Sequence, residues 1–315
     1  MDRFHHLGGR SVRCILFDLG QTLWDSRAGA EPAKHAANQR VVALLRRHLA
    51  PDTLPTTDDD LLGTQFRETF REAKRALVRR DPHREPNGPQ AVVDTLRRWG
   101  IEGVDHTLAA ALFEALNVRM AEARPVFDDV IATLATLRQR GFLLGVATNR
   151  LWGGQSFRDD LQTLGLLDYL DPRAIAVSAD LGVCKPHPAL FLHALRGVGV
   201  APQEAAMVGD SLRKDILGAQ ALGMSAVWMP RPKHRRKIDT HVASGGALPG
   251  VQRGLHTPLL HVPPLLQTGE DSHLPARTPD LEGSVKEYLR GEITPDAVIE
   301  QISDVLGLFH KAGEQ

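Results

Sequence analysis

Asp18 is the first residue in the chain whose type and position could do chemistry. It follows the apolar run Cys14-Ile15-Leu16-Phe17, and such a run is typical of a buried strand in a parallel sheet. Ligands of these sheets bind just beyond the carboxyl ends of the strands, so Asp18 would be an acid at the mouth of a site. An aspartate also often begins a turn after a strand. The stretch by itself favours neither interpretation.

The same pattern recurs further along the chain, where apolar runs end in polar residues. These residues are Thr148 and Asn149, Lys185, Asp210 and, five positions later, Asp215. After parallel strands they would converge at one edge of the sheet. Carboxylates are suitable ligands for a hard cation such as Mg²⁺, and an ammonium and a hydroxyl can hold phosphate oxygens. An aspartate can also attack phosphorus, so the set indicates phosphoryl chemistry.

The elements that must position these residues alternate between strand and helix from Pro125 onwards. Apolar strands are expected at 142–147, 174–177, 205–208 and 225–229, and helices at 128–140, 157–164, 188–195 and 216–222. This alternation is typical of a doubly wound α/β domain with a mostly parallel sheet. Its core is predicted to comprise residues 11–28 and 125–230.

Residues 29–124 interrupt the α/β pattern after the first strand and show only helical periodicity. Apolar residues recur at helical spacing in 41–49 and 62–77, and further helices are expected at 91–99 and 107–120. The segment is predicted to be an all-helical domain inserted into the core. Its middle helix is strongly basic and could meet an anionic substrate, although a solvated face is the usual explanation. These basic residues are Arg67, Arg71, Lys74, Arg75, Arg79 and Arg80.

The pattern is lost after Pro230. Residues 231–293 are rich in Pro, Gly and His and are predicted to be a loosely structured or disordered insertion, with a short helix at 284–289. The basic run 233–237 could touch phosphates, but a solvated loop is the usual interpretation. Residues 294–310 fit either a helix starting at Thr294-Pro295 or a last core strand and helix, and we prefer the second.

The composition excludes several classes of protein. The 38 basic residues equal the 38 acidic ones, so the charge does not call for nucleic acid or an anionic membrane as a partner. No apolar run approaches the roughly 20 residues of a membrane span, and the first 13 residues contain no apolar signal segment. Two cysteines, Cys14 and Cys184, cannot make a disulfide framework. A cytoplasmic protein is therefore expected.

Four motifs give the chain a family resemblance. FDLGQT at 17–22, ATNR at 147–150, VCKPHP at 183–188 and GDSLRKD at 209–215 have the order and spacing found in the haloacid dehalogenase (HAD) superfamily of hydrolases. The chain resembles the members that carry a helical cap between the first two motifs. The resemblance covers roughly 13–229, and 295–309 would supply the last core strand and helix.

The resemblance implies a role for each polar residue and Mg²⁺ as the cofactor. Asp18 would be the nucleophile and a Mg²⁺ ligand, and Gly20 would offer the metal a backbone carbonyl. Asp210 would bind Mg²⁺ directly, while Asp215 would complete or orient its shell. The substrate would be a small phosphorylated molecule held by Thr148, Asn149 and Lys185, with Lys185 also neutralising Asp18.

Gly20 departs from the family pattern. Most phosphatases of the family have a second aspartate there, which protonates the leaving oxygen and later activates water. General acid–base catalysis of this kind is worth on the order of 10²- to 10⁴-fold. Gln21 can orient a water but cannot shuttle a proton at neutral pH. Asp25 is titratable and near in sequence, although it is expected to lie past the turn.

Three interpretations of this departure differ in the substrate. An acyl phosphate or anhydride has a weakly basic leaving group and hardly needs the acid. The family's dehalogenases lack the second aspartate but need no metal, so retention of Asp210 and Asp215 argues against them. Phosphonoacetaldehyde hydrolases use a cap lysine, and the cap residues 29–124 contain only Lys34 and Lys74, neither in a distinctive setting.

The sequence therefore predicts a Mg²⁺-dependent hydrolase that acts on a small phosphorylated metabolite through an aspartyl-phosphate. The alternative is a catalytically weak protein on the same fold that binds a phospho-ligand or regulates a partner. Gly20 and the long insertion after Pro230 motivate this alternative.

Overall fold

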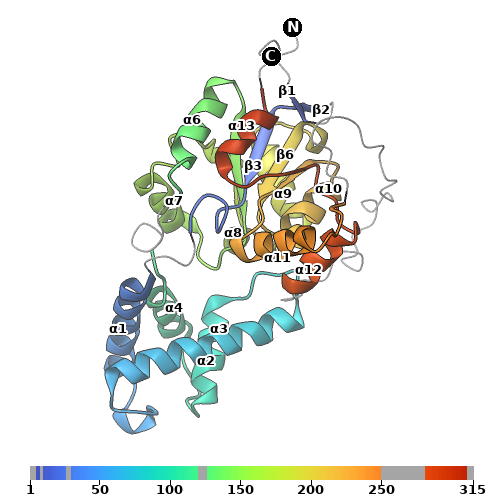
Figure 1. Ribbon diagram of the computed structural model, residues 1–315. Coiled ribbons are helices and arrows are strands. Elements are labelled where there is room, and N and C mark those ends of the chain that lie inside the picture. The colour runs from blue at the N-terminus through green and yellow to red at the C-terminus, as the bar shows by residue number, and fades with distance from the viewer. Residues whose placement is uncertain (1–4, 8–9, 26–29, 120–125, 250–280, 311–315) are drawn as a thin grey trace.

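A computed structural model of the protein describes residues 5–7, 10–25, 30–119, 126–249 and 281–310. It contains an α/β unit and a helical unit, which are the upper and lower parts of the molecule in Figure 1. The predicted boundaries between them fall within residues 26–29 and 120–125, outside the described part. No helix in the described ranges is both long and apolar enough to cross a membrane.

The central sheet has six strands among the described residues, in the order β5-β4-β3-β6-β7-β8. They are β3 (Cys14–Phe17), β4 (Leu143–Thr148), β5 (Ile175–Val177), β6 (Ala205–Gly209), β7 (Ser225–Trp228) and β8 (Ala297–Val298). Every pairing between them is parallel. The chain leaves β3 for β4 on one side and later returns to β6 on the other, which makes the end of β3 the topological switch point where ligands bind. Asp18 follows directly.

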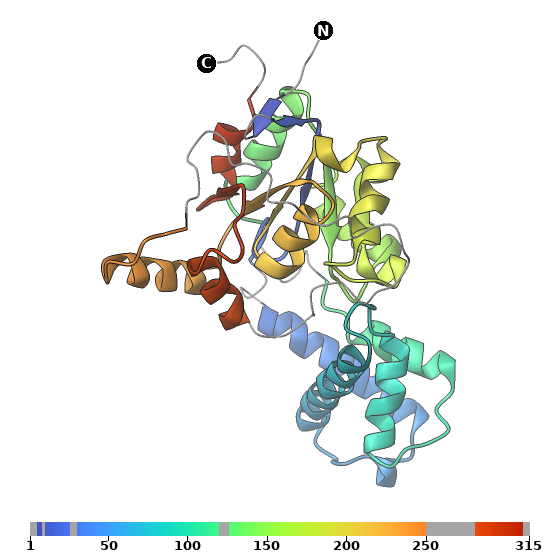
Figure 2. The same ribbon diagram turned by 90° about the vertical axis from the view of Figure 1, so that its right-hand side faces the viewer.

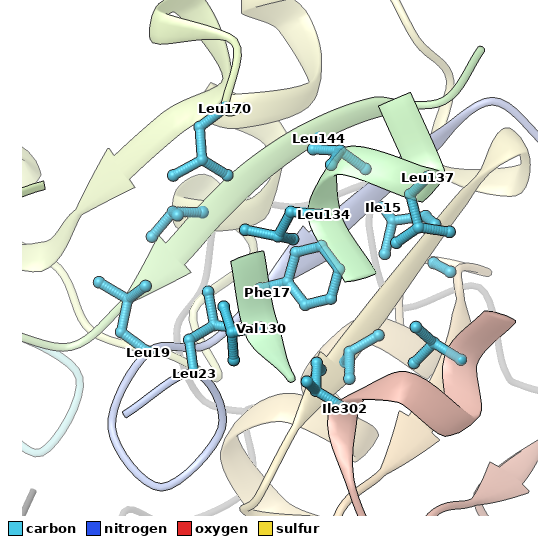
Figure 3. Packing of buried hydrophobic residues seen from close by; sticks show 14 of the residues in the cluster. Ile15, Phe17, Leu19, Leu23, Val130, Leu134, Leu137, Leu144, Leu170 and Ile302 are labelled. Atoms are coloured by element: carbon cyan, nitrogen blue, oxygen red, sulfur yellow. The ribbon is translucent and has the colours of Figure 1, made fainter. Parts of the chain in front are cut away.

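Alternate residues of β3 point to opposite faces of the sheet. Ile15 and Phe17 pack with helices α6 (Val130–Gln139), α7 (Gly154–Thr163) and α13 (Val305–Leu308) on one face, and Figure 3 shows this cluster. Cys14 and Leu16 pack with α9 (Pro188–Gly197), α10 (Gly218–Gln220) and α12 (Leu281–Leu289) on the other. A strand buried on both faces must be apolar throughout, which explains the unbroken run before Asp18 and confirms the predicted doubly wound fold.

The helical unit, here called the cap, packs around its own apolar core. It comprises α1 (Ala30–His48), α2 (Asp59–Arg80), α3 (Gly88–Arg98) and α4 (His106–Ala115), which surround a cluster that includes Phe66, Phe70 and Phe113. The predicted helical insertion after the first strand is thus confirmed. Acceptor side chains start three of these helices by binding a backbone N–H of the first turn, from Asp58, Asn87 and Asp105.

The cap contacts the core at the edge of the sheet where β3 ends (Figures 1 and 2). Trp152, in the loop after β4, stacks on Phe113 of α4 with ring centroids 4.9 Å apart and planes 8° apart. Its Nε1 also donates to the carbonyl of Phe113 (3.3 Å). The loop that follows Thr148 is therefore anchored in the cap.

A second contact joins the cap loop between α2 and α3 to the segment just before Lys185. Arg84 and Val183 form an isolated antiparallel bridge, and the Cys184 N–H donates to the His83 carbonyl (2.8 Å). The thiol of Cys184 donates to Glu85 Oε2 (2.6 Å). These bonds hold the cap against the loop that carries the lysine.

The prediction of a loosely structured segment is wrong for residues 232–243, which form the helix α11 (Pro232–Ala243). Residues 250–280 of that segment lie outside the described part. The helix has no apolar period because it buries little besides His234, which packs near Trp228. Pro232 in its first turn and its many Lys and Arg residues are compatible with a helix, but tertiary packing decides its formation.

Other differences are smaller. The short helix at the C-terminal end of the insertion, α12, is confirmed, and so is the last strand and helix, β8 and α13. Lys185 was expected to follow a parallel strand, and this prediction is wrong. The apolar residues before it, Val183 and Cys184, lie in the loop between α8 (Ser178–Leu181) and α9, and Val183 pairs with Arg84 of the cap. The sequence also did not reveal the antiparallel hairpin β1 (His5–Leu7) and β2 (Arg10–Val12).

Candidate active site

Asp18 is the centre of the site. Its backbone N–H donates to the Val208 carbonyl (2.9 Å), which extends the pairing of β3 and β6 by one bond. One carboxylate oxygen, Oδ1, accepts from Lys185 Nζ (2.7 Å) and from Thr148 Oγ1 (3.3 Å). The ends of β3 and β4 and the loop before α9 thus bring three predicted residues together around one oxygen atom.

Lys185 lies between two carboxylates. Its Nζ is 2.7 Å from Asp18 Oδ1 and 2.6 Å from Asp215 Oδ1, and only 1% of the side chain is exposed. Burial disfavours the charge, but the two carboxylates outweigh it and raise the pKa of Lys185 above its ordinary value. The ammonium is therefore a permanent positive charge at the centre of the site.

Asp215 reaches the site because of Gly209 and a π-helical turn. The turn spans Leu212–Leu217, and such turns are frequent at functional sites. The Ser211 N–H donates to Asp215 Oδ2 (2.9 Å). A Cβ at Gly209 would lie 2.4 Å from this carboxyl group, so only glycine leaves room for it. Burial raises the pKa of Asp215, against the opposing effect of Lys185.

Asp210 follows β6 and is also buried. Its backbone carbonyl accepts from Trp228 Nε1 (3.0 Å), which ties it to the neighbouring strand β7. Its carboxylate pairs with the guanidinium of Arg231. Burial raises the pKa of Asp210 to about 6, and the hydrogen bond from Arg231 offsets only part of this effect.

Three carboxylates make a set that fits Mg²⁺. Within the described residues, oxygen atoms of Asp18, Asp210 and Asp215 lie within 4.8 Å of one another. Mg²⁺ takes oxygen ligands at about 2.0–2.1 Å, so a small closing of the cluster would place all three in its shell. The donors are hard and anionic, as this ion prefers, and Lys185 neutralises only part of their charge.

Comparison with known proteins identifies the family of this chain. A family model of haloacid dehalogenase-like hydrolases matches residues 12–223. The chain belongs to this family. It is 32% identical over 224 residues to the glyceraldehyde 3-phosphate phosphatase of Methanopyrus kandleri, covering 71% of this chain and 86% of that protein.

Two solved structures of the family share the fold of this HAD-like hydrolase. The 2-haloacid dehalogenase of Pseudomonas syringae pv. Tomato has a TM-score of 0.53 at 25% identity, with 94% of this chain and 97% of that chain covered. The HAD-hydrolase YfnB of Bacillus subtilis, bound to magnesium, has a TM-score of 0.50 at 18% identity, with 94% and 98% covered.

Asn149 has a contact that the motif did not specify. Its Nδ2 donates to the Lys185 carbonyl (3.1 Å), and its Oδ1 accepts from the Lys185 N–H (2.7 Å). Both ends of the amide are thus used to hold the backbone of the lysine. The Asn149 side chain of this HAD-like hydrolase thus binds the backbone of Lys185, and its place beside a phosphoryl group stays a prediction.

Gly20 lies in a tight turn that contains no acid of its own. Three N–H groups, of residues 22–24, donate to the Leu19 carbonyl, and the Gln21 N–H donates to the Trp24 carbonyl. Gln21 has a positive φ of 65°, a conformation uncommon outside glycine. Its Nε2 donates to Asp25 Oδ1 (2.7 Å), so Asp25 turns back toward the residue that follows Gly20.

Arg231 is a residue of the site that the sequence patterns did not predict. The basic run expected to be a solvated loop starts at Lys233, two positions further on. The sequence does place Arg231 just after the strand expected at 225–229, and Asp210 just after the strand expected at 205–208. The two residues lie close together if these two strands are neighbours in the sheet. Only the observed order β6-β7 makes them so.

Proposed function

We propose that this HAD-like hydrolase is a Mg²⁺-dependent phosphatase that acts on a small phosphorylated metabolite through an aspartyl-phosphate on Asp18. The observation that carries the proposal is the convergence of Asp18, Lys185, Asp210 and Asp215 within hydrogen-bond or metal-ligand reach of one another. The glyceraldehyde 3-phosphate phosphatase of Methanopyrus kandleri supports a small phosphate ester as the substrate class.

The geometry suits attack on phosphorus by Asp18. One oxygen of Asp18 is already bound by Lys185 and Thr148, which leaves the other to form the new bond to phosphorus while the bond to the leaving oxygen breaks. Lys185 and the Thr148 hydroxyl then stabilise charge on the phosphoryl oxygens. Bound to the three aspartates, Mg²⁺ would supply the positive charge that lets a carboxylate approach a phosphate.

Water then cleaves the aspartyl-phosphate and releases phosphate. In this chain neither step has an acid at position 20 to move the proton. The carboxylate that leaves an acyl phosphate is a weak base and needs no proton from the protein. The alkoxide that leaves an alkyl phosphate is a strong base and needs a proton from another donor. We therefore expect acyl phosphates to be turned over faster than alkyl phosphates of similar size.

The dehalogenase likeness leads to a different expectation for the same nucleophile. A halide leaves without a proton and without a metal, so a dehalogenase has no need for a cluster of buried carboxylates. Asp18, Asp210 and Asp215 carry three negative charges, and the two positive charges of Lys185 and Arg231 leave a net negative charge that a metal cation would neutralise. The cluster therefore favours phosphate over halogenated acids as the reacting group.

Phosphate release tests the proposal. Wild-type protein and Asp18→Asn would be assayed with acetyl phosphate, glyceraldehyde 3-phosphate and other sugar phosphates, with Mg²⁺ and with a chelator. We expect turnover that needs Mg²⁺ and is lost in Asp18→Asn, with an unchanged circular dichroism spectrum. Full activity in Asp18→Asn, or release of halide but not phosphate, would refute the assignment.

Gly20 also favours a second function, that of a phospho-ligand-binding or regulatory protein with little turnover. Such a protein would bind phosphorylated ligands in a Mg²⁺-dependent way without releasing phosphate. Calorimetry beside the release assay separates the two functions. Binding of any ligand in the panel without turnover favours the regulatory protein, and Mg²⁺-dependent release from any of them favours the enzyme.

A further inference from the structure

We propose that Arg231 is a tethered cation that competes with Mg²⁺ for Asp210 and so sets the affinity of the site for the metal. This inference rests on the proposed Mg²⁺ site, and it concerns the metal-free state of that site. It assigns a positioning role to a residue that lies outside all four sequence motifs.

The pairing of β6 and β7 places Arg231 near Asp210. β7 runs beside β6, with Trp228 opposite Gly209, and the Met229 N–H continues the ladder to the Gly209 carbonyl (2.9 Å). Two residues later, Arg231 stands at the start of α11, whose Arg235 donates to the Pro230 carbonyl (3.0 Å). The strand end and the helix start thus hold the Arg231 backbone beside the carboxylate.

The two cations of the site bind different carboxylates. Lys185 binds Asp18 and Asp215, and Arg231 binds Asp210. Asp210 is only 3% exposed, and a buried carboxylate without a counter-charge is strongly destabilising. The guanidinium therefore neutralises Asp210 in the metal-free protein, as Mg²⁺ would in the metal-bound protein.

The two occupants of Asp210 exclude each other electrostatically. A divalent ion bound to Asp210 would lie a few ångströms from the guanidinium, and like charges at that distance repel strongly in a buried site. Arginine remains protonated at every working pH, so a change of pH does not relieve the repulsion. Mg²⁺ must displace the side chain, and the cost of displacement weakens binding.

The test is a calorimetric titration of Mg²⁺ into metal-stripped, full-length protein. Arg231→Gln removes the charge, Arg231→Lys retains it, and Arg236→Gln removes an identical charge from an exposed position on the same helix. We expect Arg231→Gln to bind Mg²⁺ roughly tenfold or more tightly than wild type. Arg231→Lys and Arg236→Gln should stay within about threefold of wild type.

Thermal unfolding supplies a second readout that a merely structural arginine would not produce. Metal-free Arg231→Gln should unfold at a lower temperature than wild type, because Asp210 loses its partner. Saturating Mg²⁺ should raise its Tm by more than it raises that of wild type, because ligand stabilisation follows affinity. A variant that folds only with Mg²⁺ present would support the proposal for the same reason.

Three outcomes would overturn the inference. They are a folded Arg231→Gln that binds Mg²⁺ no more tightly than wild type, a tightening of equal size in Arg236→Gln, and a variant that stays unfolded in saturating Mg²⁺. Wild-type protein that binds no Mg²⁺ at millimolar concentration would instead refute the metal in the proposed function. The two failures are thus distinguishable.

Discussion

The cations of the core and those of the cap have different partners. In the core, the buried Lys185 and the half-buried Arg231 bind three carboxylates that lie close together. In the cap, Arg67, a half-buried cation of the basic helix α2, donates instead to Asn38 Oδ1 and to the Leu116 carbonyl. Burial, and then the neighbouring Arg71 and Arg40, lower the pKa of Arg67 to about 10.

The partners of a cation distinguish a functional charge from a structural one. In the sequence α2 is strongly basic and carries more positive residues than the segment around Lys185. A charge that is buried against opposite charges from several strands is costly to assemble, so its presence indicates a ligand. A cation that binds neutral groups or solvent within one domain does not indicate a ligand.

The largest effect is expected from the core lysine. Lys185→Met removes the ammonium shared by Asp18 and Asp215 and leaves two carboxylates facing each other. We expect phosphate release to fall by roughly 10³-fold or more and unfolding to become easier by about 3–5 kcal/mol. Steady-state assays and urea unfolding would measure the two effects. An active Lys185→Met would remove the distinction between core and cap charges.

Gly20→Asp should have the next largest effect, and in the opposite direction. It would restore a proton donor to the core, and we expect turnover of alkyl phosphates to rise by about 10²-fold with little change for acyl phosphates. The measurement is kcat on one substrate of each kind. No gain in a variant that still binds Mg²⁺ would show that the proton already comes from elsewhere, and Asp25→Asn would then test the carboxyl that Gln21 holds.

Gly209→Ala tests whether the position of the Asp215 carboxyl group depends on the space left by glycine. The added methyl group would lie 2.4 Å from the Asp215 carboxyl and must push it away from Lys185. We expect about tenfold weaker Mg²⁺ binding, and about 1–3 kcal/mol lower stability from overpacking. The matched control is Gly307→Ala in α13, where a Cβ meets nothing within 4 Å. Equal effects of the two variants would contradict the prediction.

The smallest effect is expected in the cap. Arg71 lies exposed on the basic helix, so Arg71→Gln should change kcat and KM by less than about twofold and stability by less than about 0.5 kcal/mol. A severalfold rise in KM would show that the basic face of α2 meets the anionic substrate after all. In that case cap charge, too, would be functional.

Local patterns in the sequence were sufficient for the architecture. An apolar run buried on both faces, followed by a polar residue, specifies a parallel strand and its functional end. Parallel strands present these ends at one edge, so the neighbourhood of Asp18, Thr148 and Asp210 follows from the pattern alone. The helical cap follows in the same way, because the periodicity changes after the first strand.

Tertiary structure decided whatever depends on which segments become neighbours. Arg231 meets Asp210 only because β7 lies next to β6, and the order of strands is not contained in their spacing along the chain. Asn149 turns to the backbone of Lys185 because a loop from 36 positions later in the chain passes beside it. Residues 232–243 form a helix through packing near Trp228 rather than through their own periodicity. A sequence encodes burial locally, whereas the pairing of distant charges is settled only when the chain has folded.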